Sequence, residues 1–383
     1  MAGNIDKRLT SLKARRSGTD RLSRVAKADQ TFIALAASQL SESYQKRAPT
    51  QPYTRYALGA MQEVGPEYTR ISLETADRVK NQLYNSFQLL NRSVDFRLQG
   101  SVPCNIHIRG VSDVDLLILD DAFFTYDILG PSARSGYYNS PVPYTPISAL
   151  GSLRAHIEKI LPEKFPAAEV DISGGKAVKI SGGSLARPVD VVPSHWHNTS
   201  DYQSSKMEVD RAIRILDKKY QVTIDNMPFR HIKRITDRDT MTALSLKKAI
   251  RLCKHVKSDA EDEGTAVSLP SFDIAATMYH ANLSNLRAGA GYELGILAET
   301  QRHLDELARN SDLAQSLIVP DGSRRIFDTS AKLQGLLALS LEMDDLAKEV
   351  SREQNSPLRT ILGRELSFSE MRAALNDIYI PVL

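Results

Sequence analysis

The sequence is poor in the features that mark secreted, membrane-spanning or low-complexity proteins. Its 383 residues include two cysteines, Cys104 and Cys253, too few for a disulfide framework, which favours a reducing cytosol. No run of 18 uninterrupted apolar residues occurs, so no membrane span is expected. The 20 glycines and 17 prolines exclude collagen-like or low-complexity sequence. We therefore expect a cytoplasmic protein without a membrane partner.

An excess of charge of one sign is also missing. The chain has 49 basic and 46 acidic residues, a formal net charge of +3, which excludes a nucleic-acid binder whose affinity rests on counterion release alone. The first thirty residues are basic and polar. They could touch nucleic acid or form a solvated face, and we favour the solvated face. At 42% hydrophobic and 25% charged residues, the chain can bury a core.

The hydrophobic pattern changes along the chain. Apolar residues recur at helical spacing over 71–92 and then alternate with polar residues. Strands are predicted at 93–98, 114–119, 168–172, 177–180, 188–192, 213–216 and 221–224. Between them, we expect a loop at 127–146 and a helix at 147–161 that Pro162 ends. After about residue 228, helices are predicted at 239–257, 271–286, 291–310, 331–352 and 368–378.

Three aspartates on two predicted strands are the most informative residues. Asp113 and Asp115 point to the same side, because side chains alternate along a strand. Two such carboxylates repel each other unless a cation pairs with them. Mg²⁺ is typically held by one or two carboxylates together with substrate phosphates. Asp190 lies in the apolar run 188–193, where a lone ionised carboxylate is costly without a partner.

A Gly-Ser pair adds to this pattern. If the strand of Asp190 lies beside the first strand, three carboxylates converge and could hold two metals about 3.5–4 Å apart. Gly100 and Ser101 follow the strand at 93–98, and such a turn offers backbone N–H groups and a hydroxyl to a phosphate. An Asp-x-Asp pair alone is weak evidence, because it also occurs at strand edges and turns. The combination predicts a metal-dependent phosphate site.

The order strand, Gly-Ser, Asp-x-Asp, strand, Asp resembles the DNA polymerase β-type nucleotidyltransferase superfamily. The run LKKAIRLCK at 246–254, followed by LPSF at 269–272, resembles the lysine helix and serine–aromatic step of the cyclic GMP–AMP synthase and oligoadenylate synthetase-like enzymes. Their bacterial members are the CD-NTases of antiphage signalling. NMPFRHI at 226–232 also resembles the linker of the bacterial members. The resemblance covers about residues 70–285.

This resemblance implies an α+β fold in three parts. A polymerase β-like nucleotidyltransferase core at 70–228 would combine a mixed sheet, flanking helices and a long bracing helix. An N-terminal helical arm at 1–69 would pack on this core. A C-terminal helical lobe at 229–383 would complete the nucleotide-binding cleft.

The resemblance also implies a role for each site residue. Asp113, Asp115 and Asp190 would hold two Mg²⁺ ions, for which Mn²⁺ can substitute, and Asp190 would activate the attacking ribose hydroxyl. The implied nucleotide ligands are Gly100 and Ser101 at the triphosphate, Lys254 and Ser271 at the phosphates, and Phe272 stacked on a base. The family more often has tyrosine at position 272, so a phenolic contact is missing here.

One part of this set has its own spacing argument. Lys247, Arg251 and Lys254 recur on one helix face. Such a stripe can line a phosphate site, and it can equally be a solvated basic face, which is the commoner structure where no acidic residues accompany it.

The implied activity is synthesis of a cyclic di- or trinucleotide from NTPs, ATP and a second NTP, with release of pyrophosphate, in CBASS-type defence. Implied partners are the NTPs, a downstream effector reached through the product, and CBASS accessory proteins, with no stable nucleic-acid partner. Two alternatives stay open. One is a linear oligonucleotide synthetase or a transferase acting on RNA or protein. The other is a degenerate nucleotide-binding module, against which the complete aspartate set argues.

Overall fold

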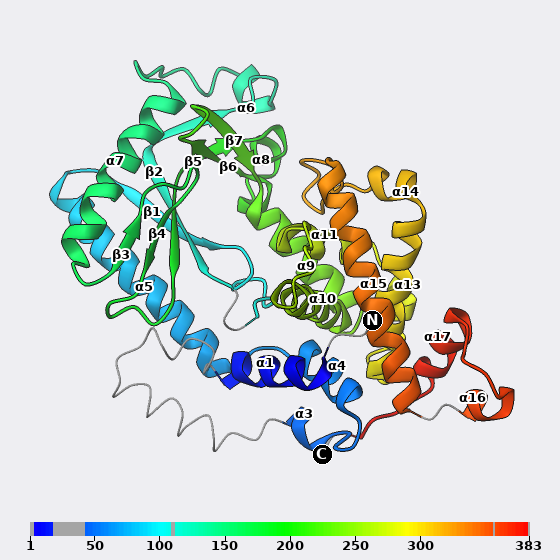
Figure 1. Cartoon of the computed structure of the whole chain (residues 1–383). Coiled ribbons are helices and arrows are strands. Elements are labelled where there is room, and N and C mark those ends of the chain that lie inside the picture. Colours follow the sequence, from blue (N-terminus) through cyan, green and yellow to red (C-terminus); the bar gives the residue numbers. More distant parts are fainter. Residues whose placement is uncertain (1–3, 18–42, 109–111, 355–356, 382–383) are drawn as a thin grey trace. The chain divides into compact units, whose positions relative to one another are not determined.

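The structure is a computed structural model that describes residues 4–17, 43–108, 112–354 and 357–381 (Figure 1). Contacts divide the chain into two units. The sheet unit comprises Gly65–Cys104 and Ser112–Lys233. The helical unit comprises Met1–Val64, Asn105–Val111 and Arg234–Leu383. Among the described residues, no helix is long and apolar enough to cross a membrane.

A mixed seven-stranded sheet forms the sheet unit. Its central path runs β1 (Val94–Gln99), β2 (Val114–Tyr126), β5 (Val189–Asn198), β4 (Val178–Ser181) and β3 (Glu169–Asp171). β6 (Ala212–Asp217) pairs with β5 and with β7 (Val222–Asn226). β2 and β5 are parallel, and the other described pairs are antiparallel. All the predicted strands are confirmed, and β2 and β5 extend further because they pair again beyond a bulge between Asp120 and Phe124.

Two long helices pack against one face of this sheet (Figure 1). They are α5 (Pro66–Leu89), the predicted bracing helix, and α7 (Pro146–Lys164). Alternate residues of β2 and β5 enter their shared core, since successive strand residues face opposite sides. That core includes Val79, Leu83, Phe87, Leu153, Ile157, Val114, Leu116, Ile118, Val189 and Val191.

Two local predictions in this unit were wrong. Pro162 lies inside α7, which ends at Lys164. A proline removes one backbone N–H, and in the last turn this loss does not stop the helix at once. The predicted loop at 127–146 contains a short helix, α6 (Pro131–Arg134), which begins at a proline with the φ that a first helical turn needs.

Helices form nearly all of the helical unit. They are α1 (Ile5–Ser17), α3 (Ser43–Lys46), α4 (Pro52–Met61), α10 (Ser245–Asp262), α11 (Ser271–Tyr279), α12 (Leu283–Ala288), α13 (Glu293–Arg309), α14 (Ser311–Ser316), α15 (Ser330–Glu353), α16 (Pro357–Leu362) and α17 (Phe368–Asn376). α9 (Pro228–Met241) begins in the sheet unit. The helix predicted at 271–286 is divided into α11 and α12, because the Asn282 side chain accepts a hydrogen bond from the backbone N–H of Asn285 and caps α12.

The N-terminal basic residues form the solvated face that we favoured only in part, since Lys7 and Lys13 are exposed but two arginines are not. Arg8 and Arg15 are only 5% and 4% exposed. Arg15 pairs with Asp259 of α10 at 2.7 Å, and Arg8 pairs with Glu263 at 2.6 Å. Helix α1 belongs to the helical unit, where it packs on α4 and α10.

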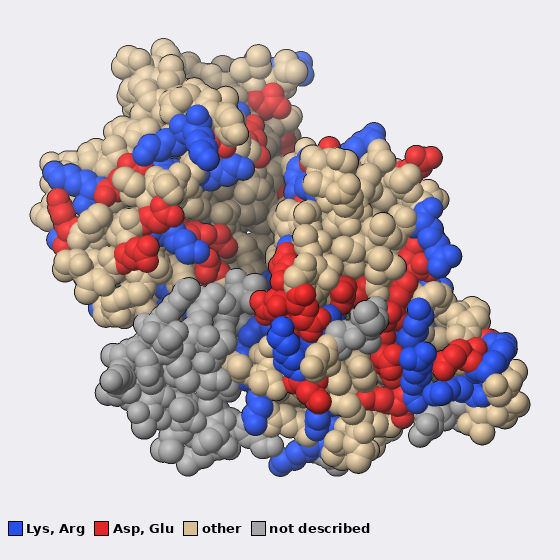
Figure 2. All heavy atoms as spheres, in the orientation of Figure 1, with Lys and Arg blue, Asp and Glu red and all other residues tan. Residues whose placement is uncertain are grey.

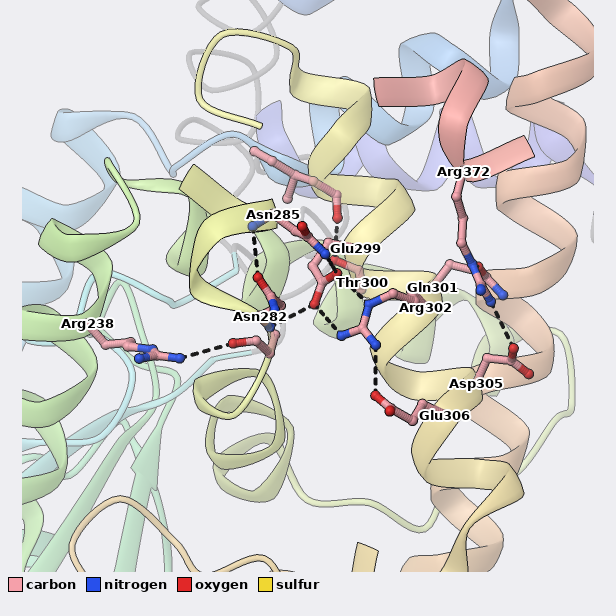
Figure 3. A network of polar contacts seen from close by, with 12 residues as sticks. Arg238, Asn282, Asn285, Glu299, Thr300, Gln301, Arg302, Asp305, Glu306 and Arg372 are labelled. Atoms are coloured by element: carbon pink, nitrogen blue, oxygen red, sulfur yellow. Dashed lines mark hydrogen bonds and ion pairs between the residues drawn. The ribbon is translucent and has the colours of Figure 1, made fainter. Parts of the chain in front are cut away.

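A polar network on α13 ties several helices of this unit together (Figure 3). The Glu299 carboxylate accepts hydrogen bonds from the backbone N–H of Asn282 at 2.7 Å and from the Asn285 amide at 2.8 Å. Gln301 donates to Asp344 of α15 and accepts from Arg372 of α17, both at 2.6 Å. Because buried polar groups are costly when unpaired, this network fixes α12, α15 and α17 against α13.

Candidate active site

One row of side chains crosses the sheet near the start of β2 and β5. Asp115 of β2 lies opposite Asp190 of β5 in the parallel pairing. Gln99 of β1 lies opposite Asp115, Lys179 of β4 lies opposite Asp190, and Asp171 of β3 lies opposite Lys179. Directly paired residues of a sheet point to the same face. We call Gln99, Asp115, Asp190, Lys179 and Asp171 the acidic row.

The sequence of the two central strands places this row on the face away from α5 and α7. Val114 and Leu116 flank Asp115 and are buried in the core against these helices. Val189 and Val191 flank Asp190 in the same way. The strand period of two then turns both carboxylates to the opposite face. The predicted convergence of Asp115 with Asp190 is thus a property of the observed register.

Asp113 lies one strand period before Asp115 and immediately precedes β2. Its carboxylate forms an ion pair with the ammonium of Lys179. The side chain of Asp113 is 23% exposed, and that of Lys179 is 43% exposed. The third predicted aspartate is therefore linked to the acidic row through a lysine on β4.

Gly100 follows β1 and meets the acidic row directly. Its φ is +79°, a backbone conformation that favours glycine. A Cβ atom at this position would also collide with a carboxylate oxygen of Asp115. Glycine is required here on both counts, and it lets the backbone approach the carboxylate closely. Ser101 follows at the beginning of the turn and is half-buried.

The electrostatic surroundings of Asp190 favour a cation. Burial raises the pKa of Asp190 above its usual value, and the neighbouring carboxylates of Asp113 and Asp171 raise it further, while Lys179 opposes them. Gln99, at the other end of the row, has a buried side-chain oxygen without a hydrogen-bond partner among the described residues. The row therefore contains one buried acceptor, the Gln99 side-chain oxygen, that no described donor satisfies.

These residues fit a divalent cation in donor chemistry but do not form a complete cage. Within the ranges that the structure describes, no three His, Cys, Asp or Glu side chains are grouped so that they could hold a metal ion. The ion pair with Lys179 engages Asp113. Asp115 and Asp190 remain side by side, and two carboxylates completed by substrate phosphates are a usual Mg²⁺ ligand set.

Lys254 lies on α10 in the helical unit and is only 3% exposed. Its ammonium donates to the carbonyl of Ile106 at 2.8 Å. Arg251, one turn earlier, donates to the carbonyls of Met61 and Asn105 at 2.9 and 2.8 Å. Burial lowers the pKa of Arg251 to about 10. These two cations of the predicted stripe are therefore not a solvated face, since both bind backbone carbonyls inside the unit.

Ser271 and Phe272 begin α11 in the helical unit. Ser271 is exposed and Phe272 is half-buried. The Arg324 guanidinium lies over the Phe272 ring, 5.4 Å from its centroid. Arg324 is held there by the buried carboxylate of Asp273, at 2.5 Å. The Phe272 ring, at the predicted base-stacking position, therefore packs against Arg324, which Asp273 holds in place.

Sequence reasoning missed three residues of the acidic row, Gln99, Lys179 and Asp171. Gln99 and Lys179 each had a weak signal, because Gln99 directly precedes Gly100 and Lys179 alternates with the apolar residues of its short strand. Neither signal says which strands are neighbours. Only the strand order places β4 beside β5 and so brings Lys179 to Asp190.

Paired carboxylates on adjacent strands, a Gly-Ser turn beside them, and a mixed sheet backed by two helices define a polymerase β-like nucleotidyltransferase. Solved structures support this fold. A CdnE c-di-GMP synthase from Capnocytophaga granulosa is similar with a TM-score of 0.67 and 25% identity, over 92% of this chain and 99% of that one. One from a Flavobacteriaceae species has a TM-score of 0.70 and 23% identity, over 93% and 99%.

Sequence comparison identifies the particular family. A cyclic dinucleotide synthase, CdnE, from Yersinia aleksiciae is 42% identical over 371 residues, covering 94% of each chain. A c-di-GMP synthase from Capnocytophaga granulosa is 32% identical, over 71% of this chain and 80% of that one. No protein-family model matches. The chain belongs to the CdnE cyclic dinucleotide synthases, which are CD-NTase nucleotidyltransferases, and the resemblance seen in the sequence is confirmed.

Proposed function

We propose that this protein joins two nucleoside triphosphates into a cyclic dinucleotide and releases pyrophosphate. The observation that carries the proposal is the placement of Asp115 opposite Asp190, with Gly100 against Asp115. The relative that is 42% identical is named a cyclic dinucleotide synthase, which favours a two-nucleotide ring over a larger one. Other relatives are named c-di-GMP synthases, so guanine is the first base to test.

The residues of the acidic row would share the chemistry. Asp190 would accept the proton of the attacking ribose hydroxyl, because its carboxylate lies beside Asp115 at the proposed metal site. Asp115 and Asp190, with Asp113, would hold Mg²⁺ or Mn²⁺, which when bound stabilises the negative charge of the phosphates. Gly100 gives the backbone close access to the triphosphate, and Ser101 would donate its hydroxyl to it.

The helical-unit residues Lys254, Ser271 and Phe272 complete the proposed nucleotide ligands. Ser271 is exposed in the first turn of α11, where backbone N–H groups and a hydroxyl suit a phosphate. Phe272 would stack on a base, which any base permits through its π-face. Lys254 would contribute positive charge, and its bond to Ile106 means that it would also hold residues 105–106 in place.

The product would act as a signal to a separate effector protein in antiphage defence, in the cytosol and with CBASS accessory proteins as further partners. The two similar solved structures are described as STING-associated, which supports an effector that binds a cyclic dinucleotide. On the face drawn in Figure 2, basic and acidic side chains are interspersed. The formal net charge of +3 favours a small-molecule product over a nucleic-acid partner bound through counterion release.

Product analysis tests this proposal. The full chain is incubated with single NTPs and with NTP pairs in Mg²⁺ or Mn²⁺, treated with phosphatase, and analysed by mass spectrometry. A phosphatase-resistant cyclic dinucleotide is expected, and it should disappear in a variant carrying Asp113→Ala and Asp115→Ala. Asp121→Ala, which removes an exposed aspartate of the same strand, is the matched control and should keep the product.

Other results would select the alternatives. A linear, phosphatase-sensitive product would overturn cyclisation in favour of an oligonucleotide synthetase. Nucleotide binding that both proteins retain, without any product under either metal, would favour a binding module.

A further inference from the structure

Lys179 occupies a position that the nucleotidyltransferase reaction does not explain. It is the cation of the acidic row, between Asp190 on one side and Asp171 on the other. Its ammonium forms an ion pair with Asp113, the carboxylate one strand period away from the row. A single lysine thus lies among carboxylates from three different strand segments.

The charges explain why a cation belongs at this point. Carboxylates crowded on one sheet face disfavour one another's ionised form, and Asp190 lies directly opposite Asp115 on the neighbouring strand. Lysine supplies a compact positive charge on a flexible four-carbon stem. The ammonium of Lys179 therefore offsets part of this repulsion when no other cation is present.

The same ion pair competes with a divalent cation. An oxygen of Asp113 that accepts from an ammonium cannot be fully available as a metal ligand, and two cations at one carboxylate repel each other. Because the side chain of Lys179 is 43% exposed, it can turn away without disturbing the core.

We propose that Lys179 is an exchangeable counter-cation of this site, which neutralises Asp113 in the metal-free enzyme and is displaced when a divalent cation binds. The displaced ammonium then contacts a phosphate oxygen of the bound nucleoside triphosphate. This inference rests on the proposed function, since it assumes that Asp113, Asp115 and Asp190 take a metal with nucleotide. It makes metal and nucleotide binding mutually supportive through one residue.

Metal binding without catalysis tests the exchange. Mn²⁺ affinity is measured by electron paramagnetic resonance on the full chain, first with Mn²⁺ alone and then with a non-hydrolysable NTP analogue. In Lys179→Gln, affinity for Mn²⁺ alone should rise by about threefold or more, because the competing charge is gone. The additional gain in Mn²⁺ affinity caused by the analogue should shrink by a similar factor, while Lys179→Arg should stay close to the wild type.

Lys176→Gln is the matched control, because it removes the same charge from the loop just before β4, outside the acidic row. Its Mn²⁺ affinity should not change. Equal tightening in both variants would overturn the inference in favour of a general charge effect, and so would unchanged or weaker Mn²⁺ binding in Lys179→Gln. Circular dichroism confirms that each variant is folded.

A further variant separates failure of this inference from failure of the proposed function. Asp115→Asn should abolish Mn²⁺ binding in the presence of the analogue. If it does and Lys179→Gln behaves like the wild type, only the role of Lys179 is overturned. If wild type and Asp115→Asn bind Mn²⁺ equally, the proposed metal site itself is wrong.

Discussion

Asp115 and Asp190 lie directly opposite each other on the parallel strands β2 and β5. Helices α6 and α7 and strands β3 and β4 separate them in the sequence. Parallel neighbours need such a crossover, so the chain must leave the sheet after β2 and return through β5 to bring the two carboxylates together. Because Asp115 lies directly opposite Asp190, its substitution is the most direct test of the site.

Asp115→Asn should reduce nucleotide transfer by at least about 100-fold, in the range found when a single charge-stabilising group is removed from an active site. The fold should persist, because the substitution keeps the side-chain shape and relieves repulsion with Asp190. The rate of product formation by liquid chromatography and the melting temperature measure these effects. Asp121→Asn on the same strand should keep the wild-type rate. A rate within tenfold of wild type in Asp115→Asn would contradict the assignment.

Gly100→Ala should impair both stability and activity. The alanine would have to adopt the positive φ of Gly100, which is unfavourable for a residue with a side chain. Its Cβ would also collide with the Asp115 carboxylate. Gly136 is a matched control, because it has φ +76° but no atom within 4 Å of a Cβ. We expect about 1 kcal/mol of destabilisation from φ in each variant, with loss of activity only in Gly100→Ala. Urea unfolding and product formation separate the two effects, and equal activity in the two variants would refute the close approach.

Phe272→Ala should raise KM for the nucleotide by about tenfold, because base stacking on an aromatic ring contributes about 1–3 kcal/mol. Phe272→Tyr keeps the ring and should restore KM. Steady-state kinetics on both variants measure the change. Loss of kcat with unchanged KM in Phe272→Ala would point instead to a packing role under Arg324.

Arg15→Met should destabilise the helical unit by about 3 kcal/mol, because it leaves Asp259 as a buried, weakly compensated charge. The side chains of Arg15 and Asp259 are 5% and 2% exposed, and their charged groups lie 2.7 Å apart. The Tyr56 hydroxyl also donates a hydrogen bond to Asp259 at 2.5 Å. The free energy of unfolding in urea measures the loss. Arg70→Met, at an exposed ion pair with Glu67, should leave it unchanged. Equal effects would show that burial does not govern the Arg15 pair.

Stability should fall as the pH drops from about 6.5 towards 4. Burial lowers the pKa of His195 to about 4, so below pH 6.5 the unfolded chain binds a proton that the folded chain does not. The full loss from this residue is about 3 kcal/mol at pH 4. Urea unfolding between pH 7 and 4.5 measures it. His195→Gln should make the free energy of unfolding depend less on pH. Part of the pH dependence should remain in this variant, because burial also lowers the pKa of His255. An unchanged slope in His195→Gln would contradict this origin.

The local elements of the sheet unit were predictable because their signals are short-range. Alternation predicted strands around Leu116 and Val191, and helical spacing predicted α5. The Asp-x-Asp pair and Gly100-Ser101 likewise predicted a metal-dependent phosphate site from a few consecutive residues. Prediction failed where context decides, as at Pro162, whose effect depends on its position within the last helical turn.

By itself, the sequence determined the residue types of the site. It also determined that each carboxylate lies on the face opposite its apolar neighbours, because side chains alternate along a strand. Only the tertiary structure decided which strands are neighbours. That order places Asp190 beside Asp115 and brings Lys179 to Asp113. Helix packing pairs Arg15 of the basic N-terminal helix with the buried Asp259 of α10. Strand order and ion pairing between distant segments depend on the packing of the whole chain, which no local pattern of residues contains.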